Sequence, residues 1–170
     1  MTDASIRRAD SRDAAALAAL GGDTFTETFG HLYPPQDLRA FLETVYTPES
    51  FARALDDPDQ ALWLAELDGA AIGYAQAGLC GLPHPEVTPG CGELKRLYVR
   101  RSAQGSGLGG RLLDTALTWL ATPSRRLWIG VWSQNVGAQR LYGRHGFEKV
   151  GEYEFPVGET RDQEFILRRG

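Results

Sequence analysis

The chain has 170 residues, which suits one domain with a substantial hydrophobic core, and we expect a single domain over residues 1–170. The formal net charge of −4 disfavours a general nucleic-acid-binding protein and slightly favours a cationic substrate. No apolar run is long enough to span a bilayer, and no basic, apolar leader is present. We therefore expect no membrane partner, no nucleic-acid partner and a cytoplasmic location.

The first half of the chain predicts a short strand, three helices and a β-hairpin. Ser11 or Asp13 caps the first, alanine-rich helix, which we expect to break near Gly21. Pro34 and Pro35 restart a helix, and an Asp-Gly pair joins the two strands of the hairpin. The predicted elements are a strand over 5–9, helices over 13–21, 35–45 and 48–55, and strands over 61–67 and 70–77.

The second half begins with a loop rich in Gly and Pro over 78–92 and continues with alternating strands and helices. Leucines at helical spacing predict a long helix that Pro123 ends. The predicted elements are strands over 93–100 and 127–132, helices over 108–122 and from 135, and a final hairpin over 148–155 and 162–168. This order predicts an α/β fold with a mixed, largely antiparallel sheet flanked by helices.

A glycine-rich turn lies between the strand 93–100 and the long helix. Four glycines remove side chains within six residues, so backbone N–H groups can converge on an anion at the positive end of the helix dipole. The turn therefore predicts a pyrophosphate-binding cradle, and its glycines are Gly105, Gly107, Gly109 and Gly110.

Two common phosphate-binding motifs do not fit this turn. A P-loop requires a Lys beside its second conserved Gly, and the turn has none. Gly105, Gly107 and Gly110 spell the dinucleotide pattern G-x-G-x-x-G, but the next strand runs into Ser-Gln-Asn at 133–135, where that site needs a carboxylate for the ribose. A nucleotide-dependent oxidoreductase is therefore disfavoured.

Three ordered motifs between residues 93 and 147 resemble the GNAT superfamily of acyl-CoA-dependent N-acetyltransferases. They are E-L-x-x-L-x-V from Glu93, Q-x-x-G-x-G from Gln104, and N-x-x-A-x-x-L-Y-x-x-x-G-F from Asn135. The resemblance implies the GNAT fold, an enzyme that uses acetyl-CoA as co-substrate without a metal, and a homodimer. It also implies that the strands 93–100 and 127–132 splay apart around the pantetheine arm.

The resemblance assigns a set of coenzyme-binding residues. Their backbone groups do most of the binding, and an N–H near Tyr98 or Val99 polarises the thioester carbonyl, for which we expect a β-bulge near Leu97 and Tyr98. Arg100 or Arg101 could add charge at the phosphates or lie on the surface. The implied residues are Leu97, Tyr98, Val99, Gln104, Gly105, Ser106, Gly107, Leu108, Gly109, Gly110, Asn135 and Tyr142.

Acetyl transfer to an amine requires a base for the ammonium proton and an acid for the leaving thiolate. Glu93 lies eleven residues before Gln104, a spacing that resembles the position of the base in histone-acetylating relatives, which makes it the candidate base, with a solvated residue at the strand end as the alternative. The resemblance of the N-x-x-A-x-x-L-Y motif implies that the Tyr142 phenol lies near the coenzyme sulfur, which makes it the candidate acid, with a core tyrosine as the alternative. Asn135 lies seven residues before Tyr142, so the two share a helix face, and Asn135 can bind pantetheine, cap the helix, or do both.

The resemblance to the GNAT superfamily implies that the segment between the first two helices lines the acceptor site. That segment is rich in aromatic residues here, which suits an amine on an apolar stem. The string F-T-E-T-F-G over 25–30 resembles bacterial spermidine/spermine N-acetyltransferases, which implies a small polyamine-like acceptor. The aromatic residues could equally be core contacts at near-helical spacing. The candidate acceptor-binding residues are Phe25, Phe29, His31, Tyr33, Glu93 and Trp132.

Two other functions remain open at this point. A protein N-terminal or lysine acetyltransferase would need an open groove beside Glu93, whereas a small amine would need a closed aromatic pocket. A non-catalytic acyl-CoA-binding module would keep the glycine turn but tolerate loss of the acid and the base. Cys80 and Cys91 lack zinc-type spacing with His84, so we expect free thiols and no metal site.

Overall fold

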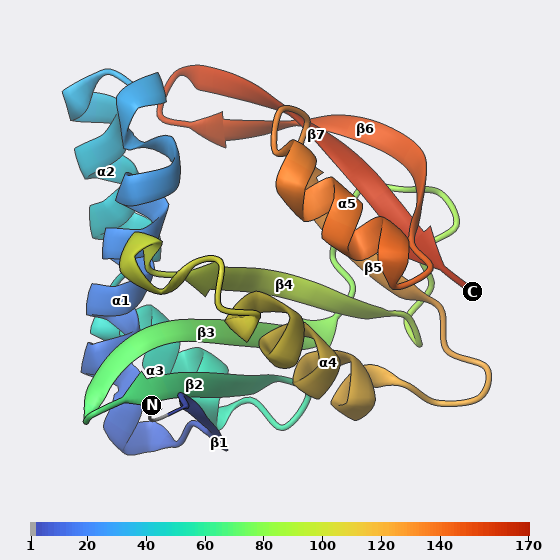
Figure 1. The fold of residues 1–170 in the computed structure, drawn as a ribbon. Helices are drawn as coiled ribbons and strands as arrows, with labels where there is room; N and C mark the ends of the chain where they lie inside the picture. Colours follow the sequence, from blue (N-terminus) through green and yellow to red (C-terminus); the bar gives the residue numbers. More distant parts are fainter. Residues whose placement is uncertain (1–2) are drawn as a thin grey trace.

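The computed structural model describes residues 3–170 as a seven-stranded sheet with helices on both faces (Figure 1). The strand order is β1-β2-β3-β4-β5-β7-β6, and every neighbouring pair is antiparallel except β4 and β5. The α/β fold with a mixed, largely antiparallel sheet is therefore confirmed. The strands are Ser5–Arg8 (β1), Ala61–Leu67 (β2), Ala70–Leu79 (β3), Gly92–Val99 (β4), Leu127–Trp132 (β5), Glu148–Val157 (β6) and Thr160–Arg169 (β7).

The helices cover the two faces of the sheet separately. One hydrophobic cluster joins α1 and α3 to β2 and β3, and a larger cluster joins α4 and α5 to the other face of β2–β5. No helix among residues 3–170 is both long and apolar enough to cross a membrane. The α-helices are Ala14–Phe29 (α1), Pro35–Val45 (α2), Pro48–Asp56 (α3), Leu108–Leu120 (α4) and Val136–Arg144 (α5), and the short 3₁₀ helices are Ser11–Asp13 (η1), Gly30–Leu32 (η2) and Arg101–Ala103 (η3).

The first helix does not break at Gly21, which corrects the prediction from sequence. α1 continues through both glycines to Phe29. A Cβ atom on Gly21 would lie 2.7 Å from Cδ1 of Tyr46 and 3.2 Å from the hydroxyl of Tyr74. Gly21 therefore allows α1 to pack closely on these two rings, and tertiary packing offsets its low helix propensity.

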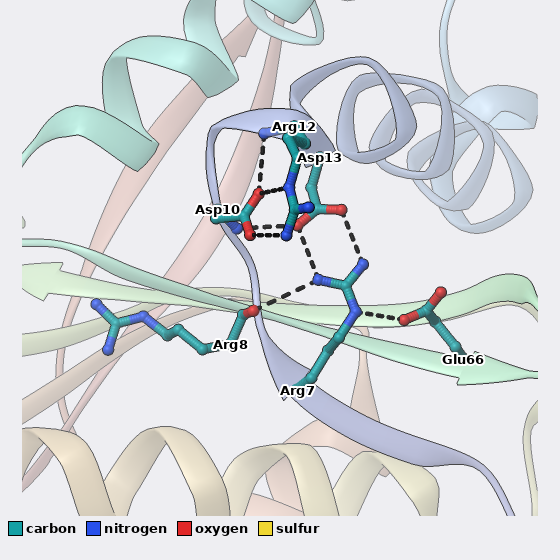
Figure 2. A network of polar contacts seen from close by, with 6 residues as sticks. All are labelled: Arg7, Arg8, Asp10, Arg12, Asp13 and Glu66. Atoms are coloured by element: carbon teal, nitrogen blue, oxygen red, sulfur yellow. Dashed lines mark hydrogen bonds and ion pairs between the residues drawn. The ribbon is translucent and has the colours of Figure 1, made fainter.

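An ion-pair network fixes the start of α1 to the edge of the sheet (Figure 2). The guanidinium of Arg7 on β1 donates to both carboxylate oxygens of Asp13, at 2.9 and 2.8 Å, and to Glu66 on β2. Asp13 also accepts the N–H of Asp10 in a capping box. Because Arg7 is a bidentate donor, it orients both carboxylates at the junction of β1, β2 and α1.

The parallel strands β4 and β5 separate after only three residue pairs. Gly92, Glu93 and Leu94 pair with 127–129, and beyond them the two strands diverge. The β4 edge that faces β5 therefore offers backbone N–H and C=O groups without a strand partner. The splay that the family resemblance implied is present.

The β-bulge in β4 lies nearer the start of the strand than expected. Gln76 pairs with Arg96 and Ala77 pairs with Leu94, which leaves Lys95 as the extra residue, whereas the sequence suggested Leu97 and Tyr98. The bulge reverses the alternation of side chains along β4. As a result Leu94, Leu97 and Val99 pack with the α4 cluster, while Tyr98 packs with the α1 cluster.

The long β6–β7 hairpin crosses the top of the molecule and reaches α2 (Figure 1). At its tip Val157 is fully buried against aromatic residues of α1 and α2, and the hydroxyl of Thr160 donates to Asp37 at 3.2 Å. Gly158, with φ of 59°, lies against the Asp37 side chain. These contacts enclose space between the helices α1 and α2 and the half-sheet β5-β7-β6.

Candidate active site

A cavity of about 710 Å³ lies where β4 and β5 diverge and extends below the β6–β7 hairpin. Side chains of α1, α2, β4, β5, β6 and β7 line it. It brings together most of the predicted side chains from distant parts of the sequence: Phe25, Phe29, Tyr33, Glu93, Leu97, Tyr98, Val99, Gln104, Trp132, Asn135 and Tyr142.

The glycine turn lies at the C-terminal end of β4 and leads into α4. Gly105 and Gly107 have φ of 83° and 82°, a left-handed conformation that side chains oppose. A Cβ atom on Gly105, Gly107, Gly109 or Gly110 would meet nothing within 4 Å, so the backbone is open to a ligand. The first three N–H groups of α4 have no partner within the helix.

Three other residues of the turn fix its position. The side-chain amide of Gln104 donates to the carbonyl of Val99 at 3.1 Å, which connects the turn to the end of β4. The hydroxyl of Ser106 donates to Ala103 at 2.7 Å. Leu108 is buried in the main core, so only its backbone can face a ligand. An open turn with unpaired N–H groups, next to a gap between strands, fits a pyrophosphate with a pantetheine arm.

Arg100 and Arg101 connect the turn to α1 through acidic residues. Arg100 donates to Asp23 at 3.0 Å, and the backbone N–H of Arg101 donates to Glu27 at 2.7 Å. Glu27 therefore faces the turn and does not line the cavity. The charge of Arg100 is already compensated by Asp23.

Glu93 is almost fully buried at the inner end of the cavity. Its Oε1 atom accepts the N–H of Gly81 at 3.0 Å and the ammonium of Lys95 at 3.3 Å. Among residues 3–170 its Oε2 atom makes no protein hydrogen bond. The carboxylate is thus oriented through one oxygen, and the other can face a substrate.

Tyr142 and Asn135 lie on the α5 side of the cavity. Asn135 caps α5 by accepting the N–H of Ala138 at 3.1 Å, as predicted. Tyr142 is buried, and burial raises the pKa of its phenol. Among residues 3–170 the hydroxyl of Tyr142 makes no hydrogen bond, so it can donate to a group within the cavity.

Aromatic rings form the wall opposite β4. The Phe29 ring meets Trp132 edge-on with centroids 5.4 Å apart, and Tyr33 stacks near Phe25. These rings belong to a buried cluster, as core contacts would, and they also line the cavity, so an acceptor-binding role stays a prediction. His31 is exposed on η2 and does not line the cavity, which removes it from the predicted acceptor site.

Three polar residues of the hairpin also line the cavity and were not expected from the sequence. Asp162 and Glu164 lie on β7 two residues apart, and Tyr153 on β6 is paired with Glu164. Asp162 accepts the hydroxyl proton of Tyr33. Asp162, Glu164 and the buried Ile166 are spaced two residues apart and therefore share one face of β7. This spacing could have indicated that the two acidic side chains face the interior.

Two cations also reach the cavity, and each already has a partner. Lys95 contacts Glu93. The guanidinium of Arg96 lies 4.9 Å from the Tyr46 ring centroid and 5.5 Å from that of Phe51, and it donates to Gln76 at 3.2 Å. Cys80 and Cys91 are free thiols, as expected. Within residues 3–170 no group of three or more His, Cys, Asp or Glu side chains is placed to hold a metal ion.

Comparison with known proteins agrees with this geometry. The model of the Acetyltransferase (GNAT) family matches residues 23–147. An uncharacterised N-acetyltransferase of Lactobacillus delbrueckii subsp. lactis is 29% identical over 99% of this chain and 98% of its own length. A spermine/spermidine N(1)-acetyltransferase of Bacillus subtilis is 31% identical over 90 residues, 52% of this chain and 59% of its own.

The same fold occurs in the crystal structure of the PaiA N-acetyltransferase from Thermoplasma acidophilum in complex with coenzyme A. It superposes with a TM-score of 0.77 over 99% of both chains at 18% identity. The chain described here therefore belongs to the GNAT family of acetyltransferases. It is an N-acetyltransferase of that family.

Proposed function

We propose that this enzyme transfers the acetyl group of acetyl-CoA to a primary amine of a small, polyamine-like molecule. One observation carries the proposal: a single cavity joins the gap between β4 and β5, with Glu93 and Tyr142, to an aromatic and acidic acceptor wall. The coenzyme A bound to the Thermoplasma relative and the substrates named for the Bacillus relative support it. A cytoplasmic location and a homodimer belong to the same proposal.

The turn and the β4 edge suit acetyl-CoA, which supplies an activated acetyl thioester when bound. The unpaired N–H groups at the start of α4 would hold the pyrophosphate, and the open β4 edge would hold the pantetheine arm. A backbone N–H near Tyr98 or Val99 would bind the carbonyl oxygen of the thioester as it gains charge.

Glu93 would act as the base. An alkylammonium has a pKa of about 10.4, so the acceptor must lose a proton before it can attack. The Oε2 atom of Glu93 is free to take that proton directly or through water, while Gly81 and Lys95 hold Oε1.

Tyr142 would act as the acid. Burial keeps its phenol protonated, and the hydroxyl has no competing partner among residues 3–170. It can therefore donate its proton to the leaving sulfur. Asn135 and Ala138 line the same side of the cavity and would align the pantetheine arm with Tyr142.

The aromatic wall of the cavity favours a small acceptor. Aromatic residues of α1 and α2 pack against the β6–β7 hairpin and line the acceptor side of the cavity. A protein N-terminus or lysine as acceptor would instead need an open groove beside Glu93. The presence of both an acid and a base disfavours a non-catalytic acyl-CoA-binding module.

Calorimetry with acetyl-CoA, followed by thiol release with a panel of polyamines, aminoglycosides, amino acids and peptides, tests the proposal. We expect binding and amine-dependent release that is fastest with polyamines. If thiol release were fastest with peptides, the acceptor would be a protein and not a small amine. Binding without release from any acceptor would favour the non-catalytic module, and no binding would refute the assignment of the Gln104–Gly110 turn.

A further inference from the structure

Glu164 is a half-buried acidic group that the proposed chemistry does not use. It lies on β7, paired with Trp132 on β5 and with Tyr153 on β6, and all three residues line the cavity. Its Oε2 atom is inaccessible to solvent and has no hydrogen-bond partner among residues 3–170. A carboxylate oxygen that is shielded from water and has no hydrogen-bond partner is costly to folding, which indicates a role in ligand binding.

The groups around Glu164 make this region of the cavity electronegative. Asp162 lies two residues away on the same strand face, and both carboxylates line the cavity. The other ionisable groups facing it are the phenols of Tyr33 and Tyr153. Burial and the nearby charge of Asp162 raise the pKa of Glu164 to about 7.

No protein cation compensates this charge among residues 3–170. Lys95 is paired with Glu93, and Arg96 lies on the rings of Tyr46 and Phe51. Asp162 has a hydroxyl donor in Tyr33, but Glu164 has no such donor for Oε2. The Oε1 atom of Glu164 also makes no hydrogen bond among the described residues and, unlike Oε2, is not shielded from solvent. The position therefore has negative charge, aromatic walls and one accessible carboxylate oxygen, which together suit an ammonium group.

Glu164 and Glu93 occupy different ends of the cavity. Glu93 pairs with Trp128 on β5 and Glu164 pairs with Trp132, four residues further along. At about 3.3 Å per residue this separation is roughly 13 Å along the strand. A single amine cannot contact both carboxylates, whereas two amines joined by an aliphatic chain can approach both.

We propose that Glu164 is the specificity residue of the acceptor site, and that it binds the second, non-reacting ammonium of a diamine or polyamine whose other amine reacts near Glu93. This inference rests on the proposed function and adds to it the residue that recognises the second cationic group of the acceptor. Asp162 and Tyr33 form the neighbouring wall of the cavity, and Trp132 packs on the methylene chain of the bound diamine.

The kinetic test compares diaminobutane with butylamine, which have the same carbon chain, at saturating acetyl-CoA. In Glu164→Gln we expect the ratio of kcat/KM for the diamine to that for the monoamine to fall about tenfold to a hundredfold. The ratio cancels any general loss of activity. Glu154→Gln, an exposed glutamate on β6, is the matched control and should keep the wild-type ratio.

A second readout does not depend on turnover. Calorimetric titration of diaminobutane into the coenzyme A complex, in two buffers of different ionisation enthalpy, measures proton release. At pH 7 the wild-type protein should release about half a proton per diamine, because an ammonium drives Glu164 to its charged form. Glu164→Gln should lose this release and bind the diamine more weakly.

The outcomes separate this inference from the proposed function. An unchanged diamine preference and unchanged diamine binding in Glu164→Gln would overturn the role of Glu164, as would absence of diamine binding to the wild-type protein. Diamine binding that requires Glu164, without amine-dependent thiol release, would support the Glu164 site and refute acetyl transfer to these amines.

Discussion

Two carboxylates in this protein show how surroundings set the charge state of a residue. Asp13 receives two hydrogen bonds from the Arg7 guanidinium, which lower its pKa. Glu164 has no cation beside it, and burial raises its pKa to about 7 from an ordinary 4.5. Asp13 therefore stabilises the fold when charged, whereas a charged Glu164 destabilises it.

Replacing Glu164 by Gln should stabilise the free protein at pH 8. The folded-state pKa of Glu164 lies above its unfolded value, so the penalty is absent below about pH 4.5 and grows as pH rises to about 7. We expect a gain of at most about 3 kcal/mol at pH 8 and no gain at pH 4. Urea unfolding at both pH values measures it, and an equal gain at both would contradict the titration of Glu164.

Tyr142→Phe should lower kcat by about a hundredfold to ten-thousandfold while leaving acetyl-CoA binding nearly intact. Phe keeps the buried ring and its edge contact with Phe147 but removes the proton donor. Stopped-flow turnover and calorimetry of acetyl-CoA measure the two effects separately. Loss of binding in proportion to the loss of turnover would refute the general-acid assignment.

At the scale of elements, the neighbouring glycines of α1 differ in their surroundings. Gly21→Ala would bring a methyl group to 2.7 Å from the Tyr46 ring, whereas at Gly22 the nearest atom would be 3.9 Å away. We expect Gly21→Ala to destabilise by about 1–3 kcal/mol through overpacking. Gly22→Ala should stabilise by up to about 1 kcal/mol through helix propensity. Equal effects in urea unfolding would contradict the close packing of α1.

The start of α4 should be sensitive to negative charge. Gly107→Glu should abolish coenzyme binding, but it also places a side chain at φ of 82°. Gly109→Glu avoids this strain, because Gly109 is helical and open, and should weaken acetyl-CoA binding by at least about tenfold. Gly143→Glu on α5, also open, is the control. Unchanged affinity in Gly109→Glu would exclude a phosphate at this turn.

At the scale of the whole molecule, the pH of greatest stability should depend on carboxylates that are ion-paired, such as Asp13, and on the unpaired Glu164. Stability from Asp13 is present above its unfolded pKa of 3.8 and is lost as pH falls through its lower folded value. The Glu164 penalty grows above 4.5. We therefore expect the highest Tm at about pH 5. In Glu164→Gln we expect this maximum to lie at a higher pH, because the penalty from Glu164 is absent. A wild-type maximum above pH 7 would contradict this balance.

The order of elements followed from local sequence. Apolar periodicity, capping residues and the Asp-Gly turn located nearly every strand and helix, because these signals depend on neighbours within a few residues. Three expectations failed where distant contacts decide: α1 continues through Gly21 because of Tyr46 and Tyr74, the β4 bulge lies at Lys95, and His31 lies outside the cavity.

Local patterns predicted the α/β class, the glycine turn before α4, and the motif residues Glu93, Asn135 and Tyr142, because each is a short pattern with a local physical meaning. Only the tertiary structure placed Asp162 and Glu164 beside Trp132 and Tyr33, since these residues meet through strand pairing and hairpin packing across more than thirty positions of sequence. The proposed acceptor specificity arises there, because the whole fold leaves Glu164 half-buried, with its Oε2 atom shielded from water and without a hydrogen-bond partner among residues 3–170.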